Sequence, residues 1–251
     1  KNPNAKNITM PYSTVIPETQ KSKDGLASGL LVMAAVQREL DRAYLYLKLT
    51  NKSPKAISGF AIKFNNNAFK IAPVNTDLEI PELVSGASYE KKAEINFSGL
   101  SDDQPPACPF TIQAAMRIQT SPSDVDAFLF LIPCSLSVFM VPSNALTTSE
   151  YAEYSSSPKM AKEQNKINTS LDNEKIKEKF QQNNLNYIGS RKNDAGVEMM
   201  SFSAKLVNEM PIGCDAILDR NSGTLFLNCF APHPSILPLV LQAINFILTL
   251  Q

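Results

Sequence analysis

The residue types that carry most enzyme chemistry are few in this sequence, and they stand far apart. The single histidine, His233, lies between two prolines, with no serine or cysteine in a nucleophile motif beside it. Because a histidine-based triad needs a nucleophile, a base and an orienting acid, we interpret His233 as a structural or solvated residue. The sequence also contains no GxSxG, no Gly-rich phosphate loop and no HExxH. It is therefore predicted not to be an enzyme.

The acidic and sulfur-containing residues form no recognisable catalytic or metal motif either. Asp102 and Asp103 precede two prolines in a turn cluster, which is typical of a solvated loop. A hydrolase with an unrecognised carboxylate site stays open as an alternative. The cysteines are Cys108, Cys134, Cys214 and Cys229. They are widely spaced and lack a CxxC pair, so we expect free thiols in a reducing compartment, no metal and no other cofactor.

The overall charge argues against nucleic acid as a partner. Lys and Arg together number 24, as do Asp and Glu, so the formal net charge is zero. No global field would draw the chain to nucleic acid or to an anionic membrane. The most apolar stretch, residues 236–250, is too short to span a bilayer, and the start of the chain has no apolar signal core. We expect a cytoplasmic protein without direct membrane insertion.

The hydrophobic pattern of the first part of the chain is that of a β protein. Residues 1–25 are polar and contain three prolines, which predicts the flexible end of a hinge. Residues 26–142 alternate apolar and polar side chains in short runs separated by turn clusters. With no helical segment between the runs, they are predicted to form an antiparallel β-sandwich. The apolar run at 128–141 predicts a strand covered on both faces or a lead into a second domain.

Two helices are predicted in the second part, residues 143–251. The first covers 171–183, with Thr169 or Ser170 as its N-cap and acidic residues in its first turn. The second is apolar and closes the chain, with Ser235 as its N-cap.

Strand patterns occupy most of the remaining second part. They cover 185–190 and 199–207, and a turn-rich loop joins 214–218 to 224–230 as a hairpin. The polar stretch 149–168 receives no regular element. The fold class of this part is therefore α+β, a small antiparallel sheet flanked by helices.

Several segments, taken in order, carry a resemblance to a known family. They are LTNKS at 49–53, ISGFAIKFNNNAF at 57–69, LIP at 131–133, KFQQNN at 179–184, KL at 205–206 and LFLNCFAP at 225–232. An apolar helix follows them. The series spans residues 26–251 and resembles the appendage, or ear, of beta-adaptin, the beta subunit of clathrin-associated heterotetrameric adaptor complexes. It departs from the family at Lys70, where the family has glycine.

The resemblance implies an immunoglobulin-like β-sandwich over 26–142 and an α+β platform over 143–251. It implies a protein-interaction role, in which the appendage recruits clathrin and endocytic or Golgi-coat accessory proteins by binding short aromatic and acidic peptide motifs. Other adaptor subunits would contact the rest of the adaptor chain. The expected location is peripheral, on clathrin-coated vesicles or pits of the plasma membrane, trans-Golgi or endosomes. An appendage of a coatomer or another adaptor subunit, with different partners, is the alternative.

The resemblance also implies a peptide pocket on the platform. The family builds it around a tryptophan four residues before a proline; this chain has no tryptophan, and Tyr154 takes that spacing before Pro158. Ser155 stands where the family has lysine, and Ala127 where it has a tyrosine on the sandwich. The peptide-binding residues implied by the match are Tyr154, Arg191, Asp215, Ser201 and, with a shift of one position, Phe202.

Overall fold

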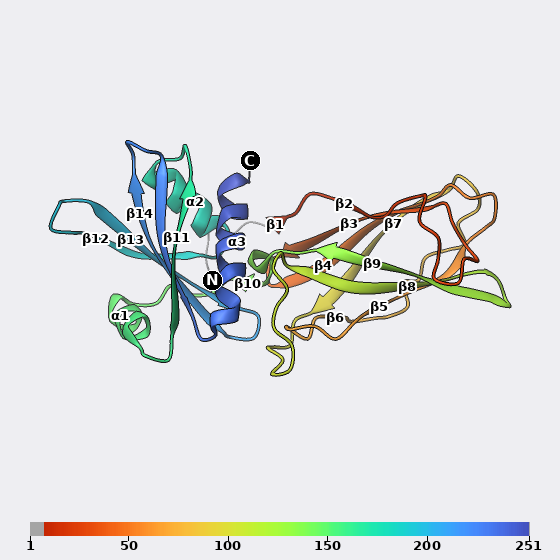
Figure 1. The fold of residues 1–251 in the computed structure, drawn as a ribbon, viewed down its shortest axis with the longest axis horizontal. Coiled ribbons are helices and arrows are strands. Elements are labelled where there is room, and N and C mark those ends of the chain that lie inside the picture. The colour runs from red at the N-terminus through yellow and green to blue at the C-terminus, as the bar shows by residue number, and fades with distance from the viewer. Residues whose placement is uncertain (1–7, 251) are drawn as a thin grey trace. The chain divides into compact units, whose positions relative to one another are not determined.

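The computed structural model describes residues 8–250, which form mainly β structure with several helices (Figure 1). They divide into two compact units, one covering Thr9–Cys134 and the other beginning at Ser135. The sequence-based boundary lay at 142/143. The division falls earlier because Met140 and Val141 form strand β10 (Met140–Val141), which pairs with β13 (Glu198–Leu206) of the second unit.

Two antiparallel sheets make up the first unit. The larger has the strand order β1-β3-β4-β7-β6, with β2 also paired to β3, and the smaller has the order β5-β8-β9. The bounds are β1 (Ile8–Thr9), β2 (Ser13–Ile16), β3 (Leu30–Glu39), β4 (Arg42–Asn51), β5 (Ser58–Phe64), β6 (Ala72–Pro73), β7 (Ser88–Asn96), β8 (Thr111–Ser121) and β9 (Asp124–Pro133).

The alternation predicted for these strands is confirmed by their burial. On β4, Leu45, Leu47 and Leu49 are buried, whereas the intervening Tyr46 and Lys48 lie on the other face and are partly or fully exposed. Successive side chains of a strand point to opposite faces of the sheet, so an alternating sequence buries one face only.

The prediction of a strand covered on both faces is wrong for β9. Phe128 and Phe130 are buried, but Leu129 and Leu131, on the opposite face, are 56% and 53% exposed. The apolar run of the sequence is two elements in succession, because β9 ends at Pro133 and the 3-10 helix η1 (Leu136–Phe139) follows.

The flexible hinge predicted for residues 1–25 is only partly in view, since residues 1–7 lie outside the described residues. Within the described part, the prediction is wrong for β2, which pairs with β3. Val15 and Ile16 of β2 are buried, at 8% and 0% exposure. The two apolar side chains and the backbone pairing hold this short strand in the sheet, although the polar sequence around it suggested a linker.

A buried carboxylate holds the turn that follows β2. Asp126 on β9 is 5% exposed and accepts hydrogen bonds from the backbone N–H of Asp24 (3.0 Å), Leu26 (3.2 Å) and Ala127 (2.8 Å). Burial opposes ionisation of this group, but the hydrogen bonds from Ser22 and the three backbone groups outweigh it and lower the pKa of Asp126. The carboxylate therefore fixes the chain at residues 22–27 onto the smaller sheet.

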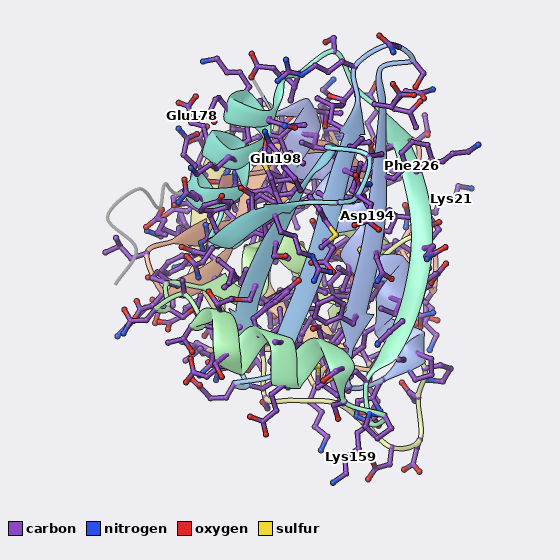
Figure 2. The ribbon with its side chains drawn as sticks, turned by 90° about the vertical axis from the view of Figure 1, so that its left-hand side faces the viewer. Lys21, Lys159, Glu178, Asp194, Glu198 and Phe226 are labelled. Atoms are coloured by element: carbon purple, nitrogen blue, oxygen red, sulfur yellow. The ribbon has the colours of Figure 1, made fainter. Side chains whose placement is uncertain are left out.

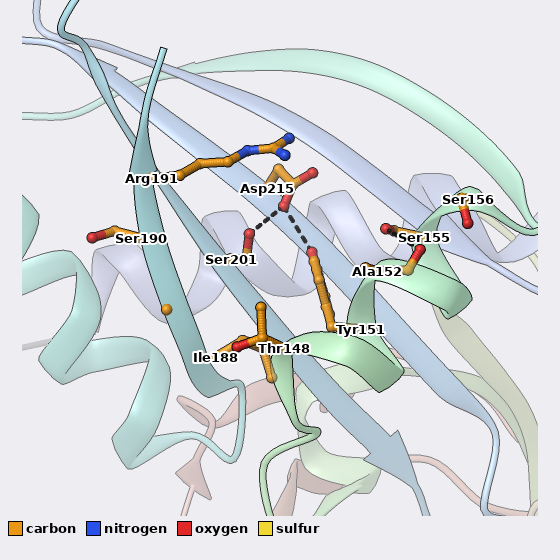
Figure 3. A pocket seen from close by; sticks show the side chains of 11 residues that line it. Thr148, Tyr151, Ala152, Ser155, Ser156, Ile188, Ser190, Arg191, Ser201 and Asp215 are labelled. Carbon is orange, nitrogen blue, oxygen red and sulfur yellow. Dashed lines mark hydrogen bonds between the residues drawn. The ribbon is translucent and has the colours of Figure 1, made fainter.

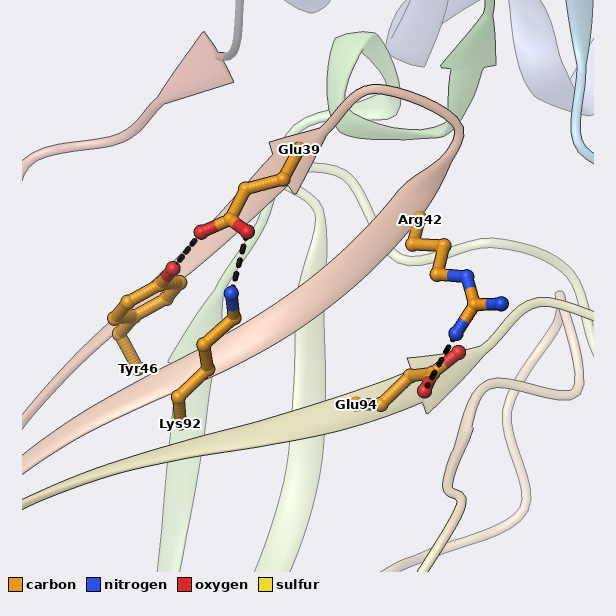
Figure 4. Close-up of polar contacts among 5 residues, drawn as sticks. All are labelled: Glu39, Arg42, Tyr46, Lys92 and Glu94. Carbon is orange, nitrogen blue, oxygen red and sulfur yellow. Dashed lines mark hydrogen bonds and ion pairs between the residues drawn. The ribbon is translucent and has the colours of Figure 1, made fainter.

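A polar cluster lies on the face of the larger sheet that points away from the core (Figure 4). The carboxylate of Glu39 accepts hydrogen bonds from the Tyr46 hydroxyl and the Lys92 ammonium, and Arg42 pairs with Glu94 at 3.5 Å. The ammonium of Lys92 also lies 4.1 Å from the ring centroid of Tyr44. Such exposed pairs contribute little stability, and here they join side chains of three neighbouring strands, β3, β4 and β7.

The second unit is built on one antiparallel sheet with the order β10-β13-β14-β15-β11, and β12 also pairs with β13. Its further elements are α1 (Thr148–Ser156), β11 (Ala161–Asn168), α2 (Asn173–Gln182), β12 (Asn186–Lys192), β14 (Pro211–Asp219), β15 (Thr224–Ala231), η2 (Pro234–Ile236) and α3 (Leu237–Thr249). The strand and hairpin predictions are confirmed to within a few residues, but α1 and β11 occupy the stretch to which no element was assigned.

One face of this sheet, called here the inner face, packs against α2 and α3. Phe202 of β13 is fully buried there, with its ring centroid 4.8 Å from that of Phe180 on α2. The apolar side of α3 completes this core, and Ala243, Ile244 and Ile247 are each 0% exposed. The predicted apolar closing helix is therefore confirmed.

The predicted N-caps of both helices are wrong. Asp172 caps α2, because its side chain accepts a hydrogen bond from the backbone N–H of Lys175 at 2.8 Å. Neither Thr169 nor Ser170 does so, since α2 begins only at Asn173. The short helix η2 leads directly into α3, whose N-cap position is Ile236 rather than Ser235, without a side-chain cap.

The four cysteines carry free thiols that differ sharply in accessibility. Cys108 is exposed, whereas Cys134, Cys214 and Cys229 are buried, and the sulfurs of Cys214 and Cys229 lie 3.8 Å apart across β14 and β15. The hydrogen bond with Cys229 and burial raise the pKa of Cys214. The thiolate is the reactive form, so Cys214 is a poor nucleophile, and burial shields Cys134 and Cys229 from reagents.

We expect iodoacetamide to alkylate the native protein at Cys108 alone and to reach all four cysteines only in denaturant. Mass spectrometry of the intact protein, with and without urea, measures this directly. A Cys108→Ser variant should remain unmodified in its native state. Rapid labelling of Cys214 under native conditions would contradict its burial in the core of the second unit.

Candidate functional site

Helix α1 lies across one end of the other face of the second unit's sheet, called here the outer face (Figure 2). A capping box begins the helix: the backbone N–H of Glu150 donates to Thr147 Oγ1 (3.2 Å), and the Thr147 N–H donates to Glu150 Oε2 (2.7 Å). These bonds satisfy backbone groups that the first helical turn leaves unpaired. The local sequence thus determines where α1 begins.

Two tyrosines and a phenylalanine attach α1 to the sheet. The ring centroids of Tyr151 and Tyr154 lie 5.5 Å and 5.6 Å from that of Phe230, which is 1% exposed on β15. The Phe230 ring covers Gly213 on β14, where an added Cβ would lie 2.1 Å from Cε2 of the ring. The missing side chain of Gly213 therefore creates the space into which Phe230 folds, and Phe230 in turn supports α1.

A carboxylate next to this aromatic contact accepts two hydroxyl hydrogen bonds. Asp215 Oδ1 accepts from Ser201 Oγ at 2.6 Å and from the Tyr151 hydroxyl at 2.9 Å (Figure 3). Burial and then the charge of Asp215 raise the pKa of Tyr151. Tyr151 thus stays protonated at neutral pH and acts as a hydrogen-bond donor that ties α1 to β14.

These groups line a pocket of about 360 Å³ between α1 and the edge of the sheet (Figure 3). Its walls are Thr148, Tyr151, Ala152, Ser155 and Ser156 from α1, Ile188, Gly189, Ser190 and Arg191 from β12, Ser201 from β13 and Asp215 from β14. The α1 residues recur at intervals of three and four, so a single face of the helix forms one wall.

A register shift in β12 places Arg191 at the rim of this pocket. Between Tyr187 and Gly189 the pairing with β13 slips by one residue, so that Gly189 lies opposite Ser201 and Arg191 opposite Met199. A β-bulge of this kind moves the following side chains to the other face of the sheet. Arg191 thus reaches the outer face, where its Nη2 lies 4.0 Å from the sulfur of Met199.

The structure brings three of the five predicted site residues together. Arg191, Ser201 and Asp215 all line the pocket. Tyr154 does not, because its ring packs on Phe230 and its hydroxyl donates to the carbonyl of Pro211 at 2.6 Å. Phe202 lies on the inner face, on the side of the sheet opposite to the pocket.

Of the α1 residues that line the pocket, the match to the family had named Ser155, but not Thr148, Ala152, Ser156 or, above all, Tyr151. A helical reading of 148–156 would have placed Thr148, Tyr151 and Ser155 on one face, and the capping box at Thr147 was the available signal. Tyr151 is one helical turn before Tyr154, which the spacing to the proline had singled out.

This arrangement suits binding better than catalysis. The one carboxylate accepts hydrogen bonds from two hydroxyls, and Tyr151 stays protonated, so these groups are joined in a hydrogen-bonded network that orients α1 and the sheet. Within residues 8–250, no three acidic, histidine or cysteine side chains are grouped to hold a metal ion. The helices of this same range are all too short or too polar to cross a bilayer. The pocket combines apolar and polar side chains in one hollow, which is the general character of a ligand-binding site.

Comparisons with known proteins indicate which family this chain resembles. Residues 142–248 match the family described as Beta2-adaptin appendage, C-terminal sub-domain. The chain is 26% identical over 231 residues to AP-1 complex subunit beta-1 of Rattus norvegicus and 25% identical over 232 residues to that of Mus musculus. Together these findings support a divergent beta-adaptin appendage, an interaction module of clathrin adaptors, and the resemblance noted in the sequence is confirmed.

The two relatives are much longer proteins. Each alignment covers 90% of this chain but only 24% of the relative, so the chain spans about a quarter of the length of the curated relatives it matches.

Proposed function

We propose that this chain is the appendage of the beta subunit of a vesicle-coat adaptor and binds short peptide motifs of coat proteins. In this proposal the first unit is an immunoglobulin-like sandwich and the second unit is the platform that holds the peptide. The module is not an enzyme and needs no cofactor. It works in the cytoplasm, peripherally on clathrin-coated vesicles or pits, and recruits clathrin and accessory proteins, while the rest of the adaptor chain contacts the other subunits.

The pocket between α1 and β12 is the observation that supports this proposal. It is concave, has an apolar wall from Ala152 and Ile188, and is lined by one cation, Arg191, and one anion, Asp215 (Figure 3). An apolar side chain of a peptide fits such a wall, while the guanidinium of Arg191 and the carboxylate of Asp215 orient its polar groups. A single motif of this kind binds weakly, and several motifs on one partner raise the apparent affinity.

The residues divide into contacts and supports. Arg191, Asp215 and Ser201 are the proposed peptide contacts, joined by Tyr151 and Ser155. Tyr154 is a positioning residue that holds α1 on Phe230. Phe202 packs the inner core. Loss of the hydroxyl alone, in Tyr154→Phe, should leave peptide binding almost unchanged, because the ring still packs on Phe230 and keeps α1 in place.

A pull-down from cytosol tests the proposal. The wild-type chain is expected to retain clathrin or endocytic or Golgi-coat proteins, and Arg191→Glu is expected to weaken retention by about tenfold, because a central charge at a binding site is reversed. Lys192→Glu is the matched control: the same charge changes on the next residue of β12, outside the residues that line the pocket. Failure of the wild type to retain any coat protein, or equal losses in the two variants, would contradict the proposal.

A further inference from the structure

The outer face of the second unit's sheet continues beyond the pocket as a row of apolar side chains. Met199 on β13 pairs with Ile217 on β14, and Ile217 pairs with Phe226 on β15. Directly paired residues lie on the same face, so the three side chains are neighbours. Phe226 is 47% exposed, and Figure 2 shows it at the end of the sheet opposite to α1.

A basic residue ends this row on each side. Arg191 on β12 pairs with Met199, and Lys166 on β11 pairs with Phe226. We call the five residues Arg191, Met199, Ile217, Phe226 and Lys166 the strip. Four steps of about 4.8 Å between neighbouring strands place the backbones of its two cations about 19 Å apart.

The charges around the strip leave its two cations available. In the described part of the chain, neither Arg191 nor Lys166 forms an ion pair. Among the described residues, the two aspartates on the same face pair with neither cation: Asp215 accepts from Tyr151 and Ser201, and Asp219 accepts from Ser222 and from the backbone of Asn221. Lys162, also on this face, adds a further positive charge opposite Phe230. The strip is thus apolar in its middle and positive at both ends.

We propose that the strip is a second docking surface, for a peptide whose apolar residues are flanked by acidic residues at both ends. The proposal rests on the proposed function as a peptide-binding appendage and specifies the peptide that the open part of the sheet accepts. The apolar residues of the peptide cover Met199, Ile217 and Phe226, while its acidic residues pair with Arg191 and Lys166.

The width of the strip sets a spacing rule for that peptide. An extended chain advances about 3.3 Å per residue, so about six residues separate two acidic groups that reach both cations. A peptide with both acidic groups at one end can pair with only one cation. The distance between the acids, rather than their number, should therefore determine affinity.

Fluorescence anisotropy with synthetic peptides tests this rule. The probe is a labelled peptide about seven residues long, with an aspartate at each end, about six residues apart, and phenylalanine and leucine in a Gly-Ser centre. A second peptide has the same composition but all aspartates at one end. The first peptide is expected to bind about threefold tighter, the gain from one additional exposed ion pair.

Variants of the strip should remove this preference. Phe226→Ser is expected to weaken binding of the first peptide about tenfold, because an exposed aromatic anchor is lost. Lys166→Gln should make the two peptides bind equally. The matched controls are Lys162→Gln, on the same strand and face, and Val207→Ser, another partly exposed apolar residue of this unit; both should bind as the wild type does.

Several results would overturn the inference. These are equal binding of both peptides by the wild type, unchanged binding by Phe226→Ser, or a loss with Lys162→Gln as large as that with Lys166→Gln. Self-association of the wild type in sedimentation that Phe226→Ser abolishes would assign the strip to a second copy of this chain. Phe226-dependent binding to phosphatidylserine vesicles in place of the peptide would assign it to a membrane surface.

The pull-down separates this inference from the proposed function. If Phe226→Ser retains coat proteins as the wild type does and also binds the first peptide normally, the strip is not a docking surface, but the proposed function stands. If the wild type retains no coat protein but binds the first peptide through Phe226 and Lys166, the proposed function is contradicted, whereas the strip is supported as a peptide-docking surface.

Discussion

Replacement of Gly213 by alanine is expected to lower the free energy of unfolding by about 2 kcal/mol, the usual cost of overpacking a tightly filled site. The new Cβ would lie 2.1 Å from the Phe230 ring, so the ring must move. Phe230 is buried beneath Tyr151 and Tyr154, and the displacement is passed on to α1. Urea denaturation followed by circular dichroism measures the change in stability.

The same substitution should also weaken peptide binding in the pocket. Tyr151 sits on Phe230 and donates to Asp215, so a shift of α1 lengthens that hydrogen bond and widens the pocket. Gly189→Ala is the matched control for stability alone, because Gly189 also lies in a strand of this sheet and has nothing within 4 Å of an added Cβ, although it lines the pocket. Equal stabilities for the two alanine variants would show that the packing of Phe230 over Gly213 does not hold α1 in place.

Replacement of Asp126 by alanine is expected to cost about 2 kcal/mol at neutral pH, because it leaves three partly buried backbone N–H groups without their charged acceptor. The turn at residues 22–27 should detach from β9, with faster hydrogen exchange at Asp24 and Leu26. Urea denaturation gives the loss of stability, and amide exchange followed by NMR locates it. Asp124→Ala is the control, since Asp124 is an exposed carboxylate on the same strand.

The effect of Asp126 should depend on pH with a definite sign. The pKa of Asp126 is lowered in the folded state, so the ionised carboxylate stabilises the fold above the ordinary aspartate pKa, and this contribution is lost as the pH falls through the folded value. The difference in stability between the wild type and Asp126→Asn should therefore be largest at neutral pH and shrink below about pH 4. A difference that is constant down to pH 2 would exclude the proposed hydrogen bonds to the ionised form.

Much of the strand structure could be predicted because its sequence signal is strong. The residues Leu45, Leu47 and Leu49 alternate with polar neighbours over a whole strand, and one buried sheet face is enough to produce that pattern. The β14–β15 hairpin was predictable from its turn residues, and α3 from its wide apolar side. In each case a local signal and the tertiary environment favour the same structure.

The elements that were missed have weak signals for a physical reason. Within α1, Tyr151 is the only buried residue, so no apolar stripe marks the helix. Strand β11 alternates exposed residues such as Lys162 and Lys166 with half-buried polar ones such as Glu163, and its pairing with β15 supplies what its sequence lacks. Short elements of this kind form because the neighbouring sheet stabilises them.

The sequence by itself predicted most of the strands, the apolar helix and the likeness to beta-adaptin appendages, and that likeness implied the pocket residues Arg191, Ser201 and Asp215. Only the tertiary structure decided that Tyr151, rather than Tyr154, faces the carboxylate. That choice depends on how α1 rests on Phe230, and Phe230 can lie flat only over a residue without a side chain, at Gly213. The sequence shows which residue types are available for a site. Which of these residues come into contact depends on strand register and on packing between residues that are distant in sequence.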